Sequence, residues 1–298
     1  MTTSHLAAEI ATQAADWRAV LTRVPEARAA LPAPGARVAV TGCGTSYYMA
    51  QAYAALREGA GQGHTDAFAA SEYPLERDYD HVVAISRSGT TTEVVELLEA
   101  LRARGRVTTA IVATAGTPIP GLAKHQLMMD EVDEQSVVQT RFATTTLALL
   151  RATLGEDLTA AIADAEGILA EDEQTALAGL LDAEQLTFVG RGWTIGLAHE
   201  AALKLRESAQ FWTESYPAME YRHGPISIAT TGRVTWAFGE VPDGLADDVR
   251  ATGARFEHRD IDPLADLVRL HRLCVAKAQQ AGVDPDRPRH LSRSIILT

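Results

Sequence analysis

Two stretches that share one pattern decide the fold: Val38–Tyr48, reading VAVTGCGTSYY, and Val82–Glu93, reading VVAISRSGTTTE. Each begins with an apolar run typical of a buried strand, continues through a short loop of glycine, serine and threonine, and ends in a helix-like segment. Hydroxyls in such loops and the free N–H groups at a helix start are the donors that a phosphate monoester needs. The pair therefore predicts a phosphate-binding site formed by two neighbouring strand–helix loops.

Neither loop has the sequence of a nucleotide-binding motif. GxxxxGK[ST] is missing, and Gly42–Gly44 lacks the third glycine of GxGxxG. The expected ligand is therefore a small phosphorylated molecule rather than a dinucleotide.

Further strands and helices alternate on both sides of these stretches. A helix is expected at Leu6–Arg23, and Pro25, Pro32 and Pro34 indicate a loop after it. Apolar runs predict five strands in the first half: Arg37–Thr41, Thr65–Ala70, His81–Ser86, Val107–Ala113 and Gln126–Met129. The alternation predicts an α/β fold with parallel strands, right-handed crossovers and helices on both faces.

The pattern starts again in the second half, with a strand at Leu186–Gly190 and a long helix at Thr194–Phe211. GRGWT after that strand repeats the form of GCGTS, which indicates an internal duplication with a shorter second copy. The expected division is an N-terminal helix and loop, a first domain, a helical linker and a second domain, at residues 1–34, 35–155, 156–182 and 183–298.

Composition excludes several classes of protein. The net charge of −12 disfavours nucleic acid and anionic membranes as partners. The N-terminus does not read as a signal peptide, and two cysteines form no disulfide framework, so a cytoplasmic protein is expected. Cys43 is expected to be a small buried residue. No metal site is expected, because neither the His199–Glu200 pair nor the Glu220–His223 pair has further ligands at helical spacing.

Five motifs in order resemble the tandem sugar isomerase (SIS) domain proteins over nearly the whole chain: TGCGTSYY, SRSGTTTE, VVQTRFATTTLALL, EAALKLRESAQFWTESYPAMEYRHGP and PRHLSRSIILT. They are most similar to the isomerase half of glucosamine-6-phosphate synthase and to its free-standing deaminase/isomerase cousins. The resemblance implies two tandem three-layer αβα SIS domains with flavodoxin-like parallel sheets. Because the chain starts at the isomerase half, without a glutaminase domain, glutamine-driven amination is not expected.

The resemblance also implies site residues. Hydroxyls of the two loops would hold the sugar phosphate: Thr45, Ser46, Ser86, Ser88 and Thr91. Glu207 would move a proton between C1 and C2 beside Lys204, and His223, supplied by the other subunit of a homodimer, would open the sugar ring. Ser292 and Arg293 would cover the sugar from the C-terminal tail.

Three positions near the sugar depart from the synthase pattern. Arg87, Gln139 and Arg293 stand where the synthase has Gln, Ser and Lys. The form SRSG is more similar to the deaminase/isomerase cousins, and Arg87 is expected to add positive charge to the phosphate loop. These departures leave the substrate and the reaction open.

Residue chemistry is compatible with the implied roles. Lys204 and Glu207, spaced i and i+3, share one helix face, which is also the spacing of an ordinary surface ion pair. Apolar neighbours predict partial burial, which favours a general base. An imidazole with a pKa near neutrality suits ring opening at His223.

Three functions are consistent with these residues. The first is a cofactor-independent isomerase or deaminase acting on an amino-sugar 6-phosphate of the glucosamine type. The second is a lyase that removes the C2 proton of an N-acetylhexosamine 6-phosphate and expels the C3 hydroxyl. The third is a non-catalytic sugar-phosphate sensor, which the retention of both Glu207 and His223 disfavours.

Overall fold

A computed structural model describes residues 4–297; the outermost residues of the first and last expected domain ranges, 1–3 and 298, lie outside the described part. The described chain divides into two compact units. The five-stranded unit comprises residues 15–135, 139–158 and 292–297, and the four-stranded unit comprises residues 4–14, 136–138 and 159–291. Residues 159–182, expected as a linker, thus group with the four-stranded unit, and residues 4–14 do so as well.

The five-stranded unit is built on a fully parallel sheet in the order β2-β1-β3-β4-β5. Its strands are β1 (Val38–Gly42), β2 (Thr65–Ala69), β3 (His81–Ser86), β4 (Thr108–Val112) and β5 (His125–Met128). All five strands match sequence-based expectations to within one residue at each end. This order is that of flavodoxin-like sheets, in which ligands bind beyond the carboxyl ends of the strands.

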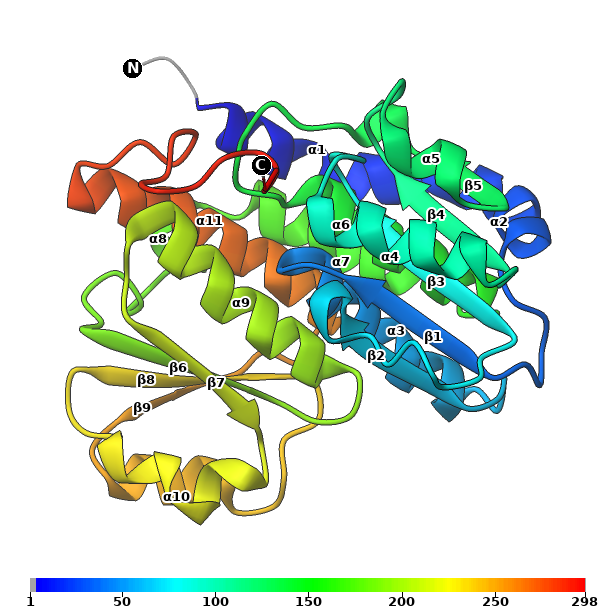
Figure 1. Cartoon of the computed structure of the whole chain (residues 1–298). Helices are drawn as coiled ribbons and strands as arrows, with labels where there is room; N and C mark the ends of the chain where they lie inside the picture. Colours follow the sequence, from blue (N-terminus) through cyan, green and yellow to red (C-terminus); the bar gives the residue numbers. More distant parts are fainter. Residues whose placement is uncertain (1–3, 298) are drawn as a thin grey trace. The chain divides into compact units, whose positions relative to one another are not determined.

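Helices cover both faces of this sheet (Figure 1). They are α2 (Val24–Ala30), α3 (Thr45–Gly59), α4 (Thr92–Ala103), α5 (Pro118–Leu122) and α6 (Arg141–Thr153). One core consists of residues of β3 and β4 packed against Leu97, Leu98 and Leu101 of α4. On α1 (His5–Val20), the indole of Trp17 is buried and donates to Thr144 Oγ1 of α6 at 3.2 Å.

Two helix starts differ from expectation. Pro25 was expected in a loop, but it lies in the first turn of α2, where a missing N–H costs nothing and the fixed φ suits a helix. The sequence also predicts a helix at Val137–Leu154, but helix α6 begins at Arg141, because residues 134–140 form a bent, non-helical segment that the carboxylate of Glu134 organises.

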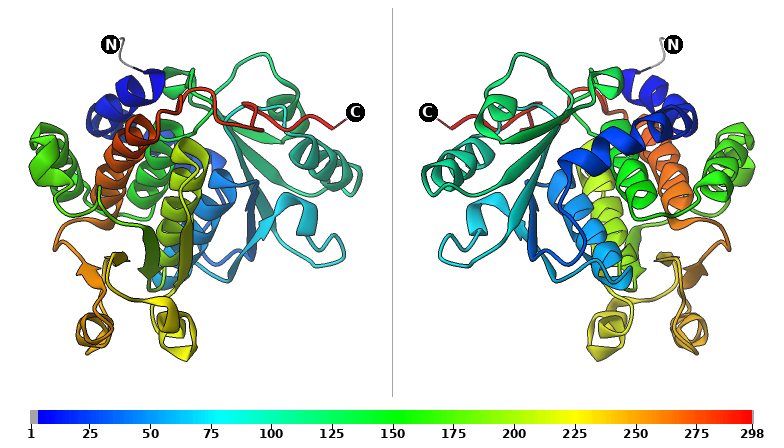
Figure 2. Two further views of the ribbon diagram at one scale, coloured as in Figure 1. Left: turned by 90° about the vertical axis from the view of Figure 1, so that its left-hand side faces the viewer. Right: turned by 90° about the vertical axis from the view of Figure 1, so that its right-hand side faces the viewer.

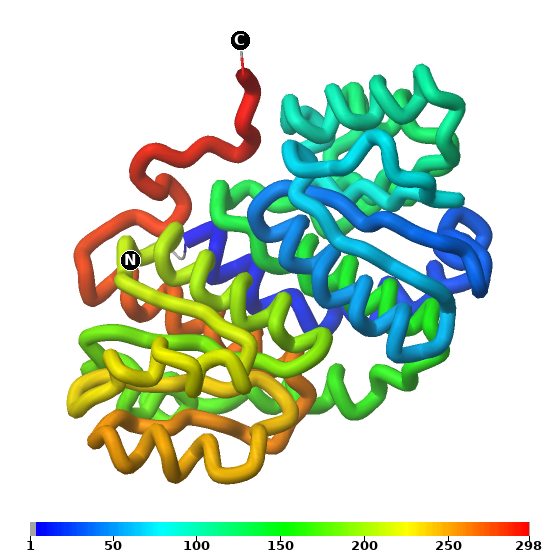
Figure 3. Tube along the Cα trace, turned by 60° about the horizontal axis from the view of Figure 1, so that its bottom comes forward, coloured from blue at the N-terminus to red at the C-terminus, as the bar shows by residue number. Residues whose placement is uncertain are grey.

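The four-stranded unit has a parallel sheet in the order β7-β6-β8-β9. Its strands are β6 (Gln185–Gly190), β7 (Thr213–Pro217), β8 (Arg233–Phe238) and β9 (Arg255–Glu257). Its helices are α7 (Thr159–Ala170), α8 (Glu173–Ala176), α9 (Thr194–Ala209), α10 (Leu245–Ala251) and α11 (Pro263–Ala281). Figure 3 traces this unit from the green strand β6 to the orange helix α11.

Burial explains how the helices of this unit are arranged. Leu245 and Val249 of α10 pack in one core with Val189 and Ala237 of the sheet, while α9 packs against α11. Trp236 of β8 is fully buried, donates to Asp266 Oδ2 at 2.7 Å, and lies under the Arg269 guanidinium at 4.2 Å. Among residues 4–297, no helix combines the length and apolar character that crossing a bilayer requires.

Strand β7 and the two short 3-10 helices after it, Glu220–His223 and Pro225–Ile228, were not expected from the sequence. The strand was missed because it is short, polar and ends in Pro217. Proline is tolerated there because β7 is an edge strand with one unpaired side.

Candidate active site

In the first loop, between β1 and α3, the backbone at Gly42 passes close to the first turn of the helix. A Cβ on Gly42 would lie 2.7 Å from the Cβ of Ser46, so only glycine allows α3 to start directly after the strand. Thr45 and Ser46 therefore occupy the first turn of α3, and both are buried. Their hydroxyls lie next to the N–H groups of a helix start, as the sequence predicts.

The second loop joins β3 to α4 and carries Ser86 at the strand end and Thr91 directly before the helix. Gly89 has a φ of +66°, which a side chain would strain. The hydroxyls of Ser88 and Thr91 are 3.4 Å apart. The Ser86 hydroxyl is buried and has no hydrogen-bond partner among residues 4–297. A buried hydroxyl without a partner is costly, and it is compatible with a bound anion.

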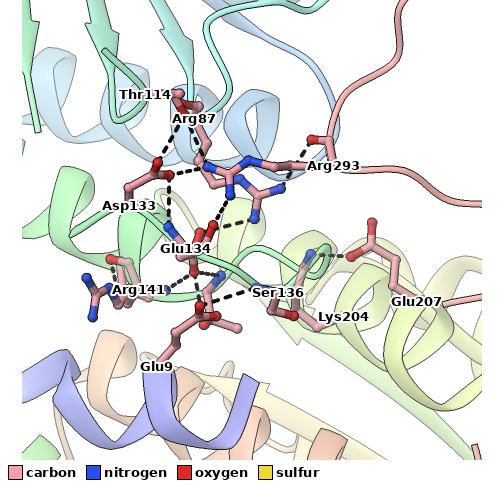
Figure 4. Close-up of polar contacts among 12 residues, drawn as sticks. Glu9, Arg87, Thr114, Asp133, Glu134, Ser136, Arg141, Lys204, Glu207 and Arg293 are labelled. Atoms are coloured by element: carbon pink, nitrogen blue, oxygen red, sulfur yellow. Dashed lines mark hydrogen bonds and ion pairs between the residues drawn. The ribbon is translucent and has the colours of Figure 1, made fainter. Parts of the chain in front are cut away.

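Arg87 does not carry free positive charge for this loop, because its side chain is 4% exposed and pairs with Glu134 at 3.3 Å. Glu134 is fully buried and accepts from Thr140 N at 2.6 Å and Arg141 N at 2.7 Å, at the start of α6. Its carboxylate thereby accepts from two backbone N–H groups that have no partner within the helix, and it holds the Arg87 guanidinium in place (Figure 4).

The C-terminal tail, residues 292–297, lies along the second loop (Figure 2). Arg293 pairs with Asp133 and donates to the carbonyl of Glu134 and, at 3.1 Å, to Thr114 Oγ1. Ser292 is exposed and donates to the carbonyl of Ser294 within the tail. The tail thus docks on the five-stranded unit, and Arg293 is held by acidic partners rather than left free.

Gln139 lies in the same unit directly before Thr140, which precedes α6. Its side-chain nitrogen is buried and has no hydrogen-bond partner within residues 4–297.

In the four-stranded unit, helix α9 presents the predicted acid–base pair. Lys204 is 1% exposed, bonds Glu207 Oε2, and lies 3.7 Å from the equally buried Glu200. The Glu207 side chain is 20% exposed. Lys204 and Glu207 therefore form an ion pair in which the cation is buried and the carboxylate is accessible. An ordinary surface pair differs, because both of its groups are solvated.

Buried neutral groups surround this pair. Burial, reinforced by the charge of Lys204, lowers the pKa of His271 to about 3, so this imidazole is neutral near pH 7. Burial likewise raises the pKa of Cys274 to about 12. Neither group is a proton donor or acceptor in the neutral range, whereas the Glu207 carboxylate near them is partly exposed. In the five-stranded unit, burial raises the pKa of Cys43 to about 11, which disfavours a nucleophilic thiolate.

His223 ends the 3-10 helix that follows β7, and its side chain is exposed. The neighbouring Arg222 is tied to Asp248 at 2.7 Å and to the Asp243 carbonyl at 2.6 Å. These bonds anchor the segment while His223 projects from it. Among residues 4–297, no three His, Cys, Asp or Glu side chains are grouped to hold a metal ion.

Several residues at these places were not singled out from the sequence: Thr90, Asp133, Glu134 and Ser294. Glu200 was considered only as half of a possible metal-binding pair, although it lies four residues before Lys204 on the same helix. Glu134 and Asp133 had a weaker one, since they form an acidic pair just after the last strand of the first sheet.

Comparison with known proteins supports the fold and the loops. Residues 33–154, which contain both loops, match the SIS domain model. Residues 33–154 form an SIS domain. This confirms the resemblance drawn from the motifs for that part of the chain.

Relatives extend the likeness beyond the SIS domain. The chain is 27% identical over 295 residues to a glutamine–fructose-6-phosphate aminotransferase of Sulfolobus acidocaldarius, covering 88% of this chain and 50% of the relative. It is 28% identical to the protein of the same name from Methanothermobacter thermautotrophicus, covering 88% and 52%. The chain spans about half the length of these curated relatives.

Solved structures agree in fold. A glucosamine-6-phosphate deaminase from Thermotoga maritima matches with a TM-score of 0.85 at 23% identity, covering 99% of this chain and 100% of that one. The C-terminal domain of glucosamine-fructose-6-phosphate aminotransferase from Francisella tularensis matches with a TM-score of 0.83 at 21% identity, covering 96% and 98%. The expected α/β fold with parallel sheets is confirmed.

Proposed function

We propose that this chain is an enzyme that isomerises or deaminates an amino-sugar 6-phosphate without a cofactor. The observation that carries the proposal is the Lys204–Glu207 pair, in which a buried cation holds an accessible carboxylate. Relatives named as aminotransferases that isomerise fructose 6-phosphate, and a fold match named as a glucosamine-6-phosphate deaminase, support the substrate class.

The phosphate of the substrate is held by the two loops of the five-stranded unit. Thr45 and Ser46 supply hydroxyls beside the start of α3, and Ser86, Ser88 and Thr91 supply hydroxyls before α4. Both helix starts add N–H donors and a favourable dipole. Arg87 acts indirectly, by tying the loop to Glu134.

Proton transfer is assigned to Glu207. In the open-chain aldose, Glu207 takes the C2 proton, the electron pair forms the C1–C2 double bond, and the C1 oxygen takes up a proton. Glu207 then returns its proton to C1, which leaves an imine at C2; addition of water and loss of ammonia give a ketose phosphate. Lys204 keeps the Glu207 side chain oriented through their ion pair between turnovers.

Ring opening is assigned to His223, whose exposed imidazole takes the proton of the anomeric hydroxyl and delivers one to the ring oxygen. We propose a homodimer in which His223 acts on the substrate of the partner. Mixing Glu207→Gln and His223→Ala proteins tests this sharing. Recovery of activity in the mixture is expected, and a mixture as inactive as its components would contradict it.

We also infer that the four-stranded unit is a shortened second SIS copy. Its order β7-β6-β8-β9 repeats the first four positions of β2-β1-β3-β4-β5. Gly190 repeats the role of Gly42, since a Cβ there would collide with Thr194 at the start of α9.

The decisive experiment compares glucosamine 6-phosphate with N-acetylglucosamine 6-phosphate in deuterium oxide, followed by mass spectrometry and an ammonia assay. A deuterated ketose phosphate with ammonia from the free amine is expected. Loss of one water from the N-acetyl sugar without ammonia would replace this proposal with the lyase. Binding of either sugar without deuterium uptake would indicate a sensor.

A further inference from the structure

The C-terminal tail uses the donors of the second loop for itself. Ser294 Oγ lies 2.9 Å from Thr90 Oγ1, 3.1 Å from Ser88 Oγ and 3.4 Å from Thr91 Oγ1. The carbonyl of Ile295 accepts from Thr92 N at 3.1 Å, at the first residue of α4. Two tail oxygens therefore stand among three hydroxyls and a helix N-terminal N–H.

These positions are where a bound phosphate monoester would place its oxygens. A phosphate at a helix start accepts from terminal N–H groups and nearby hydroxyls, which are the groups that the tail oxygens contact here. A hydroxyl and a carbonyl are neutral acceptors, whereas a phosphate offers three charged oxygens and forms stronger bonds with the same donors.

The tail is attached by polar contacts rather than by burial. Ile296 and Leu297 are 63% and 62% exposed, so little apolar surface is removed from water by docking. Arg293 is the main anchor, with Asp133, Thr114 and the Glu134 carbonyl as its partners. Arg87 adds a bond from Nη2 to the Arg293 carbonyl at 3.2 Å. Such an attachment is reversible by an anion that competes for the donors of the loop.

We propose that the tail is an internal occupant of the phosphate cradle, which a phosphate monoester displaces when it binds. The inference rests on the proposed role of the second loop. The Ser294 hydroxyl accepts from the hydroxyls of Ser88 and Thr90, and the Ile295 carbonyl accepts from Thr92 N. Binding of the phosphate transfers these donors to the ligand and releases residues 294–297 from the loop.

Hydrogen exchange on the protein tests the displacement directly. The Leu297 amide donates to Thr92 Oγ1 at 2.9 Å and reports on the docked tail. Inorganic phosphate should speed exchange of this amide and of its tail neighbours several-fold. Sodium chloride at equal ionic strength is the control, because salt alone weakens the Arg293–Asp133 pair. Unchanged or slowed exchange with phosphate would overturn the proposal.

A matched pair of variants gives the second test. Ser294→Ala removes the oxygen that occupies the hydroxyl cluster, and Ile296→Ala changes an exposed side chain of the same tail. Calorimetry with inorganic phosphate should show about threefold to tenfold tighter binding for Ser294→Ala, the loss of about one competing hydrogen bond. Ile296→Ala should bind as the unchanged protein does.

The other outcomes separate the inference from the proposed function. Equal phosphate affinity in Ser294→Ala and the unchanged protein would overturn the inference and leave the phosphate loop intact. Weaker binding by Ser294→Ala would also overturn it, by making Ser294 a ligand of the phosphate. An absence of phosphate binding by both proteins would overturn the inference and the proposed role of the loop together.

Discussion

Each unit buries a basic side chain beside carboxylates, and the two clusters differ in how many donors each carboxylate accepts. In the five-stranded unit, Glu134 accepts from Arg87, from two backbone N–H groups and from the Thr140 hydroxyl. In the four-stranded unit, the contact found for Glu207 is with Lys204, and part of its side chain reaches solvent. A saturated carboxylate fixes structure, whereas an accessible one remains available to take a proton.

The largest expected effect follows from this contrast at Glu207. Glu207→Gln removes the proposed base and keeps the side-chain shape, so turnover should fall by about 10³-fold or more. Binding of the sugar phosphate should persist, because the phosphate loops are unchanged. Glu184→Gln, at an exposed position before β6, is the control. Near-normal turnover in Glu207→Gln, measured by ketose formation, would remove Glu207 from the mechanism.

The next effect concerns stability of the four-stranded unit. Lys204→Met deprives the buried Glu200 of its cation and should lower the free energy of unfolding by about 3–5 kcal/mol. The double variant Glu200→Gln/Lys204→Met should recover most of this loss, because it removes the stranded charge. Urea denaturation measures both. A double variant no more stable than Lys204→Met alone would mean that the two groups are not coupled.

In the five-stranded unit, adjacent carboxylates allow a direct comparison. Glu134→Gln leaves the buried Arg87 without its counter-charge and should cost about 3 kcal/mol of unfolding free energy. Asp133→Asn weakens a partly exposed pair with Arg293 and should cost about 1 kcal/mol or less. Urea denaturation measures both losses. Equal losses in the two variants would show that burial does not determine how much each ion pair contributes to stability.

A further effect is a dependence of stability on pH. Burial lowers the pKa of His81 to about 4 in the five-stranded unit, as it lowers the pKa of His271 to about 3 in the four-stranded unit. The unfolded chain binds protons at these histidines below about pH 6.5, and the folded chain does not. Stability present above pH 6.5 is therefore lost as pH falls toward 4, by about 1.4 kcal/mol per pH unit for each histidine.

Two variants show which histidine, and therefore which unit, causes the loss of stability at low pH. His81→Gln should flatten the pH dependence between pH 6.5 and 4, and His271→Gln should do so independently. Urea midpoints at pH 7.5 and pH 5 give the comparison. A midpoint difference that is the same in both variants as in the unchanged protein would contradict the predicted linkage.

Much of the fold followed from local sequence because its signals are local. Apolar runs predicted the strands of the first sheet, and the glycine loops after β1 and β3 placed the hydroxyls at the starts of helices α3 and α4. The spacing of Lys204 and Glu207 predicted a shared helix face, which the structure confirms as an ion pair. These features depend on the periodicity of apolar residues and on turn-forming residues, and both can be recognised from short stretches of sequence.

Other features depend on partners distant in the sequence. The sequence indicated a free positive charge at Arg87, because its partner Glu134 lies 47 residues away. Strand β7 gave no apolar signal because its sequence, TESYP, is largely polar, and its place in the sheet depends on its pairing with β6. The docking of Ser294 joins residues more than 200 apart in sequence, and no periodic pattern encodes it.

The indole side chains offer a way to observe the two units separately. Trp17 in the five-stranded unit and Trp236 in the four-stranded unit are both buried, and their ring N–H groups bond to Thr144 and Asp266. The Arg269 guanidinium over the Trp236 ring places a positive charge against that indole. The two residues therefore emit from different electrostatic surroundings, and the fluorescence of either is isolated once the other three tryptophans, Trp193 and Trp212 included, are replaced with phenylalanine. Each unit thus carries its own optical reporter of unfolding.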